Sequence, residues 1–226
     1  MINCSNSGDI TQRTGGDAGG VTSECKDGAM INCYNTGKIT SLEQGHAAGI
    51  TTTASNLVIN CYNTGDVKGS VWVGGIAANE SAGGKIINCY NTGNISWEEN
   101  YNDYHDNNKG VGGIIGLLRS GQVINCYNSG EVTDNRPEYT GTIIGQLIYN
   151  EINSTSSCYC TAINNYSLQT EDINFNINNI GAITGDDEEN INEYVTNHNN
   201  LTFDNDGITN FRRNMKSFLA KEIIII

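Results

Sequence analysis

The sequence predicts an all-β parallel solenoid, a chain that coils repeatedly so that each coil stacks on the one before. Three observations lead to this prediction. A seven-residue phrase, Ile-Asn-Cys-Tyr-Asn-Thr-Gly, recurs along the chain. A second motif, two small residues followed by an apolar one, comes after each copy at a steady distance. Side chains within the repeat alternate with a period of two, which is typical of strands with one buried face.

The seven-residue phrase has a fixed period, since its three intact copies are spaced 28 residues apart. A period of this length indicates one small unit stacked on itself, because a single unit cannot bury its apolar face alone. With a degenerate sixth copy around Cys158 and Tyr159, the repeat predicts about 5–6 coils over residues 1–162. The clear copies lie at residues 2–8, 31–37, 59–65, 87–93 and 124–130.

Alternation within one repeat separates an inner from an outer face. In residues 31–40 every odd position is apolar, small or a corner residue, and every even position suits solvent. Asn and Gly tolerate left-handed backbone angles, so Asn35 and Gly37 predict a bend between two strands. The expected inward residues are Ile31, Cys33, Asn35, Gly37 and Ile39, and the expected outward residues are Asn32, Tyr34, Thr36, Lys38 and Thr40.

The second motif completes the coil. Its apolar residue follows the cysteine of the phrase at a nearly constant distance in four of the five units. This arrangement suits three short strands and three corners per coil, as in a parallel β-helix. We expect a right-handed coil, because parallel crossovers are usually right-handed. The copies of the motif begin at Gly19, Ala48, Gly74, Gly112 and Gly141.

Stacking places identical positions of the repeat above one another. Ile and Val are expected to line an apolar interior, while cysteines and asparagines form internal ladders in which each amide is satisfied by its neighbour one coil away. The tyrosines form an external column, either a simple stack that shields the strands or a repetitive surface for a glycan. The internal ladders are Cys4, Cys33, Cys61, Cys89, Cys126, Asn35, Asn63, Asn91 and Asn128, and the external column is Tyr34, Tyr62, Tyr90 and Tyr127.

An insertion at residues 97–109 interrupts the fourth unit. Because the flanking motifs stay intact, the extra residues are expected to bulge from a corner of the coil. Aromatic rings beside carboxylates are typical of sugar-binding sites, and paired carboxylates also serve glycosidases or bind calcium. A solvated loop without a ligand has the same composition. The residues expected to contact a ligand or partner are Trp97, Glu98, Glu99, Tyr101, Asp103, Tyr104, His105 and Asp106.

The cysteines and histidines predict neither a metal site nor a catalytic one. Five of the eight cysteines share one slot of the repeat and are expected to act as small buried hydrophobes. Stacked neighbours lie about 4.8 Å apart, which still allows a disulfide. No cysteine and histidine spacing matches a zinc site, and no cofactor is expected. Cys25, Cys158 and Cys160 are the expected reactive thiols, and His46, His105 and His198 are expected surface residues.

After Cys160 the pattern dissolves into Asn-rich sequence. Residues 163–226 are expected to form a C-terminal cap or tail of mixed helix and coil, or to be partly disordered. Ile208, Phe211 and Met215 recur at roughly helical spacing. That spacing predicts a helix laid over the last open coil, or a basic amphipathic helix for membrane or partner contact.

Composition limits the partners and the cellular location that the chain can have. A net charge of -13 with 12 basic residues argues against a nucleic-acid partner. No apolar run reaches transmembrane length. No signal peptide precedes the first repeat, so the chain is either cytoplasmic or a fragment of a longer secreted chain. We expect the fragment, extracellular or at the cell surface, with further repeats of the parent chain beside it.

The paired motifs resemble the GLUG-motif repeats of bacterial surface and secreted proteins, which include adhesin-like chains and non-catalytic regions of immunoglobulin A proteases. The resemblance covers residues 2–160, where five units carry both motifs, with departures at Ala48, Ala77 and Ala78. It implies a surface or extracellular setting and no catalytic activity.

Together these features predict a non-catalytic structural or adhesive repeat module, not an enzyme, with a host or cell-surface glycan or protein as its partner. The alternative is a carbohydrate-active or carbohydrate-binding β-helix that uses the loop at residues 97–106.

Overall fold

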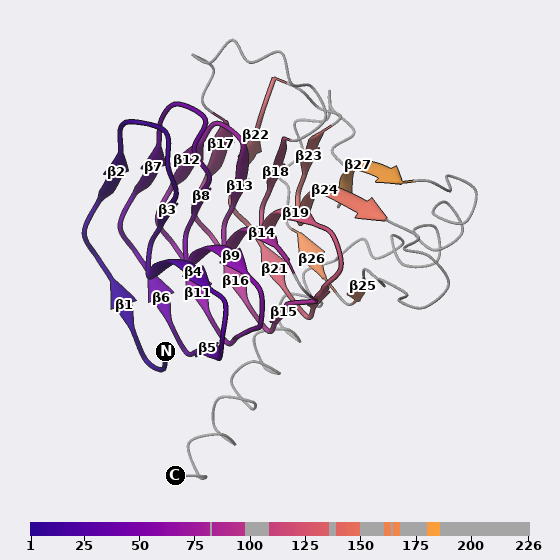
Figure 1. The fold of residues 1–226 in the computed structure, drawn as a ribbon, viewed down its shortest axis with the longest axis horizontal. Helices are drawn as coiled ribbons and strands as arrows, with labels where there is room; N and C mark the ends of the chain where they lie inside the picture. Colours follow the sequence, from indigo (N-terminus) through magenta and orange to yellow (C-terminus); the bar gives the residue numbers. More distant parts are fainter. Residues whose placement is uncertain are drawn as a thin grey trace, which may run out of the picture.

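The computed structural model describes residues 1–81, 83–97, 109–135, 139–149, 161–163, 165–167 and 180–185. In these ranges the chain forms a parallel β-solenoid, as the repeat predicted, and contains no α-helix. Figure 1 shows the coils stacked side by side along one axis, with the N-terminus in the first coil at one end of the stack.

Five sheets run along the solenoid, and successive strands of a coil belong to successive sheets. Sheet 1 contains β1 (Ser5–Asn6), β6 (Tyr34–Asn35), β11 (Tyr62–Asn63), β16 (Tyr90–Asn91), β21 (Tyr127–Asn128) and β26 (Tyr166–Ser167). Sheet 2 contains β2 (Ile10–Gln12), β7 (Ile39–Ser41), β12 (Val67–Gly69), β17 (Ile95–Trp97) and β22 (Val132–Thr133). Sheet 3 contains β3 (Ala18–Gly19), β8 (Ala47–Ala48), β13 (Trp72–Gly74), β18 (Gly110–Gly112) and β23 (Thr140–Gly141).

Sheets 4 and 5 complete each coil after the glycine corner. Sheet 4 contains β4 (Thr22–Cys25), β9 (Thr51–Ala54), β14 (Ala77–Glu80), β19 (Ile115–Leu118), β24 (Ile144–Tyr149) and β27 (Ile180–Gly185). Sheet 5 contains β5 (Ala29–Ile31), β10 (Leu57–Ile59), β15 (Lys85–Ile87), β20 (Gln122–Ile124) and β25 (Thr161–Ile163).

The coil is more finely divided than the sequence indicated. It has five strands where three were predicted, and several of them are only two residues long. Strands of two residues are too short for the alternation of inward and outward side chains to be recognised in the sequence. The five equivalent positions of the repeat span about four turns of roughly 29 residues, so the count differs slightly from the 5–6 coils expected.

Ile31 lies on the outside, contrary to the prediction. The inward position of β5 is Met30, which is fully buried and pairs in register with Val58 of β10. The cause is Asn32, whose backbone is left-handed with a φ of 55°. A left-handed residue between two strands breaks the alternation of their side chains, so Ile31 faces outward while Cys33 faces inward. The same backbone geometry recurs at Asn60, Asn88 and Asn125.

The predicted bend between two strands lies at Gly37, between β6 and β7, but neither Asn35 nor Gly37 has a left-handed backbone. Gly37 is required for space instead. A Cβ atom at Gly37 would lie 2.1 Å from the carbonyl oxygen of Gly8 in the coil before.

The core consists of two apolar clusters that run along the solenoid. The larger cluster combines the cysteines of the phrase with residues such as Met30, Ile50 and Ile76. The smaller cluster lies between sheets 2 and 3 and includes Ile39, Val67 and Val73. Both clusters take residues from successive coils, so burial is continuous from coil to coil.

Strand pairing continues across the segment that contains the insertion. Gly69 pairs with Trp97 before it, and Trp72 pairs with Gly110 after it. Residues 98–108 lie outside the described residues, as does most of the C-terminal segment 163–226. Within that segment, β26 and β27 pair in parallel with sheets 1 and 4.

Candidate functional site

The asparagine ladder, formed by Asn6, Asn35, Asn63, Asn91 and Asn128, crosses five successive coils. The Nδ2 of Asn35 donates to Oδ1 of Asn63 at 2.7 Å and to the carbonyl oxygen of Gly37 at 2.7 Å. Every other step of the ladder has the same bond at 2.7 or 2.8 Å. From Asn35 to Asn128 the residues are buried, to 1% exposure or less. The structure thus forms the internal amide ladder that stacking predicts, and each amide fixes the register of two coils.

The thiol file consists of Cys4, Cys33, Cys61, Cys89 and Cys126, one cysteine per coil. All five are free thiols, and all except Cys4 are fully buried. The Sγ of Cys61 donates to the carbonyl oxygen of Ile59 at 3.4 Å, and the backbone N–H of Cys33 donates to the same sulfur at 3.4 Å. These thiols therefore pack and bond as structural residues inside the coil.

The pKa is raised for thiols in the middle of the file, at Cys33 and Cys89. The hydrogen bond from Cys33 to Cys61, followed by burial, raises the pKa of the Cys33 thiol far above its usual range. Burial is the main cause that raises the pKa of Cys89. Burial also raises the pKa of Cys25, which lies outside the file. Cys158 and Cys160 lie outside the described residues.

The tyrosine column lies on the outer face of sheet 1. The rings of Tyr34 and Tyr62 stack with centroids 4.9 Å apart and 2° between their planes, and Tyr62 stacks on Tyr90 in the same way. All three rings are half-buried. Tyr127 differs, because it is only 8% exposed. The stacked rings offer their edges rather than their faces to solvent.

Trp97 is anchored in the coil at the start of the insertion. Its Nε1 donates to the carbonyl oxygen of Ser70 at 3.0 Å, and its ring packs against the smaller core cluster. This role differs from the ligand contact that the sequence suggested. The other candidate residues of the insertion, at positions 98 to 106, fall outside the described residues.

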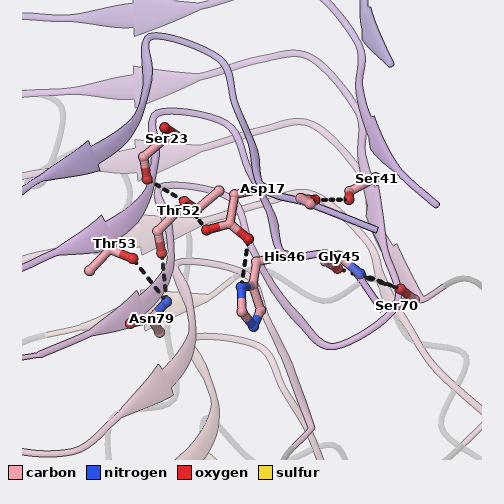
Figure 2. Close-up of polar contacts among 10 residues, drawn as sticks. Asp17, Ser23, Ser41, Gly45, His46, Thr52, Thr53, Ser70 and Asn79 are labelled. Atoms are coloured by element: carbon pink, nitrogen blue, oxygen red, sulfur yellow. Dashed lines mark hydrogen bonds and ion pairs between the residues drawn. The ribbon is translucent and has the colours of Figure 1, made fainter. Parts of the chain in front are cut away.

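A polar cluster that the sequence did not predict joins Asp17, His46 and Thr52. The Nδ1 of His46 lies 2.8 Å from Oδ1 of Asp17, and Thr52 Oγ1 donates to Oδ2 of Asp17 at 3.2 Å. Thr52 is fully buried and also lies within hydrogen-bonding distance of the Ser23 carbonyl oxygen. Figure 2 shows Asp17 between the imidazole and the threonine, so one carboxylate connects sheets 3 and 4.

The imidazole of His46 stacks on the indole of Trp72, with centroids 4.5 Å apart and 6° between the planes. The guanidinium of Arg119 lies over the same indole, 5.2 Å from its centroid. The stack along the solenoid axis takes one side chain from each of four successive coils. These side chains are Asp17, His46, Trp72 and Arg119. The guanidinium over the indole face is a cation–π contact, which is attractive.

The contacts around Asp17 hold side chains in place and do not have the arrangement that activates a nucleophile. In a catalytic triad the hydroxyl lies on the far side of the histidine from the carboxylate. Here the hydroxyl of Thr52 binds the carboxylate itself. The hydrogen bond with His46 is the main cause that lowers the pKa of Asp17, with burial acting in the opposite direction.

A second unpredicted feature is the buried carboxylate of Glu80, only 1% exposed. Its Oε1 accepts the backbone N–H of Gly84 at 2.7 Å, and its Oε2 accepts the N–H groups of Arg119 at 3.3 Å and Ser120 at 2.9 Å. Two of these donors belong to the next coil, so Glu80 fastens one corner of the solenoid to the next.

The sequence contained a signal for the first cluster but not for the second. Asp17, His46 and Trp72 each lie two residues before the second motif, so aligning the motif copies places them in one column. Three dissimilar residue types in one slot do not look like a ladder. Glu80 occurs in a single coil, and no periodic pattern marks it.

In the part of the chain that the structure describes, no helix is long and apolar enough to cross a membrane. No group of three His, Cys, Asp or Glu side chains in those same ranges is placed to hold a metal ion.

Comparison with known families gives a match to a short part of the chain. The family model of the GLUG motif matches residues 107–133, which include the glycine corner of β18 and β19 and the phrase that begins at Ile124. Neither a comparison with curated proteins nor one with solved structures gave a match. The chain thus carries a GLUG motif on a β-solenoid, in agreement with the resemblance of its repeats.

Proposed function

We propose that this chain is a non-catalytic structural repeat module with an adhesive role, and part of a larger bacterial protein that is secreted or held at the cell surface. The GLUG motif and the solenoid fold support a structural repeat module. The adhesive role, the extracellular setting and further repeats in a parent chain are the finer parts of the proposal.

The observation that carries the proposal is the asparagine ladder. The buried amides of Asn35, Asn63 and Asn91 each donate both hydrogens within the solenoid, one to the next coil and one to their own corner. The thiol file is likewise turned inward. The recurrent residues therefore serve coil stacking, which builds a rigid rod that holds other parts of a protein apart.

The outer face of sheet 1 supplies the adhesive surface in this proposal. Tyrosine combines a large apolar ring with a hydroxyl, and it suits contacts with sugars and proteins because it loses little conformational entropy on binding. The column Tyr34, Tyr62 and Tyr90 lies beside a line of exposed threonines. That line consists of Thr36, Thr64 and Thr92.

Binding and turnover assays test this proposal. The purified chain is applied to arrays of glycans and host surface proteins, and the same glycans are incubated with it and assayed for new reducing ends. The proposal predicts binding without turnover. Release of reducing ends, in a preparation freed of contaminating hydrolases, would show an enzyme instead.

Matched variants locate the binding face. Replacement of Tyr34, Tyr62 and Tyr90 by serine, the residue that the first coil already has at this position, should abolish binding and leave the fold intact. Replacement of Thr36, Thr64 and Thr92 by serine is the control and should preserve binding. If the tyrosine variant binds as well as the parent chain, the adhesive face lies elsewhere and this part of the proposal is wrong.

A further inference from the structure

Gly8 has no neighbour in this structure that requires a glycine. At the equivalent glycines of later coils, a Cβ atom would lie 1.9 to 2.1 Å from the carbonyl oxygen of the glycine one coil before. At Gly8 the closest atom is Oδ1 of its own Asn6, at 3.8 Å, which is an ordinary contact. Its φ is also outside the left-handed region, so neither space nor backbone conformation explains the glycine. The equivalent glycines are Gly37, Gly65, Gly93 and Gly130.

Asn6 is the open end of the asparagine ladder. Its Nδ2 donates to Asn35 and to Gly8, the same pair of bonds that the next three asparagines of the ladder make. Its Oδ1 accepts only the backbone N–H of Gly8, at 3.2 Å, whereas Oδ1 of Asn35 accepts the amide of the preceding coil at 2.7 Å. An amide hydrogen donated by one more coil to Oδ1 of Asn6 would give Asn6 the same set of hydrogen bonds as Asn35.

The apolar interior is also uncovered at this end. Met1 and Ile2 are 52% and 59% exposed and are the exposed large hydrophobic residues among those described. Cys4, Val21 and Ile10 pack against the core clusters but remain only partly buried. Exposed apolar surface next to unpaired strand edges is a site at which another strand layer docks.

The first coil keeps the inner residues of the repeat and changes the outer ones. Cys4, Asn6 and Gly8 match the later coils, whereas Ser5 and Ser7 replace the outward tyrosine and threonine. A terminal coil that only faced water would gain from polar residues inside as well. The retained residues are those through which one coil recognises the next.

We propose that the N-terminal face of the first coil is an acceptor surface for one further coil of the same repeat, preceding it in the same polypeptide. The incoming coil places its glycine carbonyl against Gly8, donates its ladder amide to Oδ1 of Asn6, and covers Met1 and Ile2. This inference rests on the proposed role as a repeat module of a larger protein. It names the residues of the first coil that would contact the preceding repeat.

The experiment adds a coil and asks what Gly8 then tolerates. A copy of residues 31–57 is fused directly before Met1, which places its cysteine 28 residues before Cys4 and keeps the period of the repeat. A second fusion carries the same 27 residues in shuffled order. Gly8→Ala and, as a positive control, Gly37→Ala are made in the parent chain and in the first fusion. The readout is the Tm of each protein.

The proposal predicts that the ordered fusion has a higher Tm than the shuffled one. Gly8→Ala should change the Tm of the parent chain by less than about 1 °C and lower that of the ordered fusion by about 5 °C or more. Gly37→Ala should lower the Tm of both. Equal Tm values for the two fusions, or an equal effect of Gly8→Ala in parent and fusion, would overturn the acceptor surface. The glycan and protein arrays use the parent chain, so a failure of adhesion is seen separately.

Discussion

The side chain of Asn63 donates a hydrogen bond to Oδ1 of Asn91 at 2.7 Å, across the boundary between two coils. It donates its other hydrogen to the carbonyl oxygen of Gly65, also at 2.7 Å, within its own corner. Asn63 is fully buried, so both bonds are made away from water. A single side chain therefore holds the shape of one coil and its register against the next.

Asn63→Asp should lower the free energy of unfolding by at least about 2 kcal/mol, because each buried polar group left without a partner costs about 1 to 3 kcal/mol. A carboxylate has no hydrogen to donate to Asn91 or Gly65 and brings a buried negative charge beside two oxygens. Urea unfolding followed by circular dichroism measures the change. Asn6→Asp, at the partly buried end of the ladder, is the control and should cost clearly less.

The buried thiols should resist alkylation. Thiolate is the reactive form, and the pKa values of Cys33 and Cys89 are raised. With iodoacetamide at pH 8, Cys4 should be modified in the native protein while Cys33, Cys61, Cys89 and Cys126 stay free until the chain is unfolded. Peptide mass mapping of native and denatured samples gives the answer. Rapid modification of Cys61 in the native state would contradict an internal thiol file.

Glu80→Gln should destabilise the corner between β14 and β15. A glutamine amide presents one acceptor oxygen, so one set of the N–H groups that bind Glu80 would face an NH2 group instead. We expect a loss of about 1 to 3 kcal/mol in the free energy of unfolding. Glu24→Gln is the matched control, because Glu24 is an exposed carboxylate on β4 of the same sheet, and it should have little effect.

The Asp17 pair with His46 should make stability depend on pH in acid. Since the folded pKa of Asp17 lies below its ordinary value of 3.8, the carboxylate binds protons less readily in the folded chain than in the unfolded one. Its contribution is fully present above pH 3.8 and is lost as the pH falls through the lower, folded pKa. Unfolding of the parent and of Asp17→Asn is compared from pH 7 to pH 2, and the difference between them should shrink only below about pH 4.

Trp97→Phe should lower stability by about 1 kcal/mol, the value of one hydrogen bond, because phenylalanine keeps the packing but loses the bond to Ser70. Trp97→Ala should cost about 3 kcal/mol or more, since it also removes a large packed ring. Urea unfolding measures both changes. If Trp97→Ala left stability unchanged, the indole would be free for a ligand, as the sequence had suggested.

The sequence predicted the fold and the inner ladders well, and the structure shows why. Cys33 and Asn35 recur at one position in every coil, so stacking alone places them in line. Ile31 was misplaced, because the left-handed backbone at Asn32 reverses the face of the preceding strand. Several Asn and Gly residues of the phrase tolerate that conformation, and residue type does not say which of them adopts it. The five-strand coil was missed for a similar reason, since strands of two residues carry no readable period.

The polar clusters could not be predicted from the sequence, because they form by contacts between coils whose residues differ. Asp17, His46 and Trp72 occupy one slot with three residue types, and their attraction appears only after the coils are stacked. Glu80 binds backbone N–H groups of Ser120 and Arg119, which no side-chain pattern encodes. Repetition makes the scaffold predictable from sequence, whereas departures from repetition determine the local chemistry.

The central claim, that successive repeats stack in register with one coil between equivalent residues, is tested most directly by engineered disulfides. Thr36 and Thr64 are exposed and lie on adjacent coils, because their neighbours Asn35 and Asn63 pair in register. Thr92 lies one coil further on. Adjacent strands are about 4.8 Å apart, within disulfide range, and second neighbours are about 9.6 Å apart, beyond it. Under mild oxidation and thiol counting, cysteines at positions 36 and 64 should bridge and those at 36 and 92 should not, whereas equal bridging of both pairs would contradict the stacked solenoid.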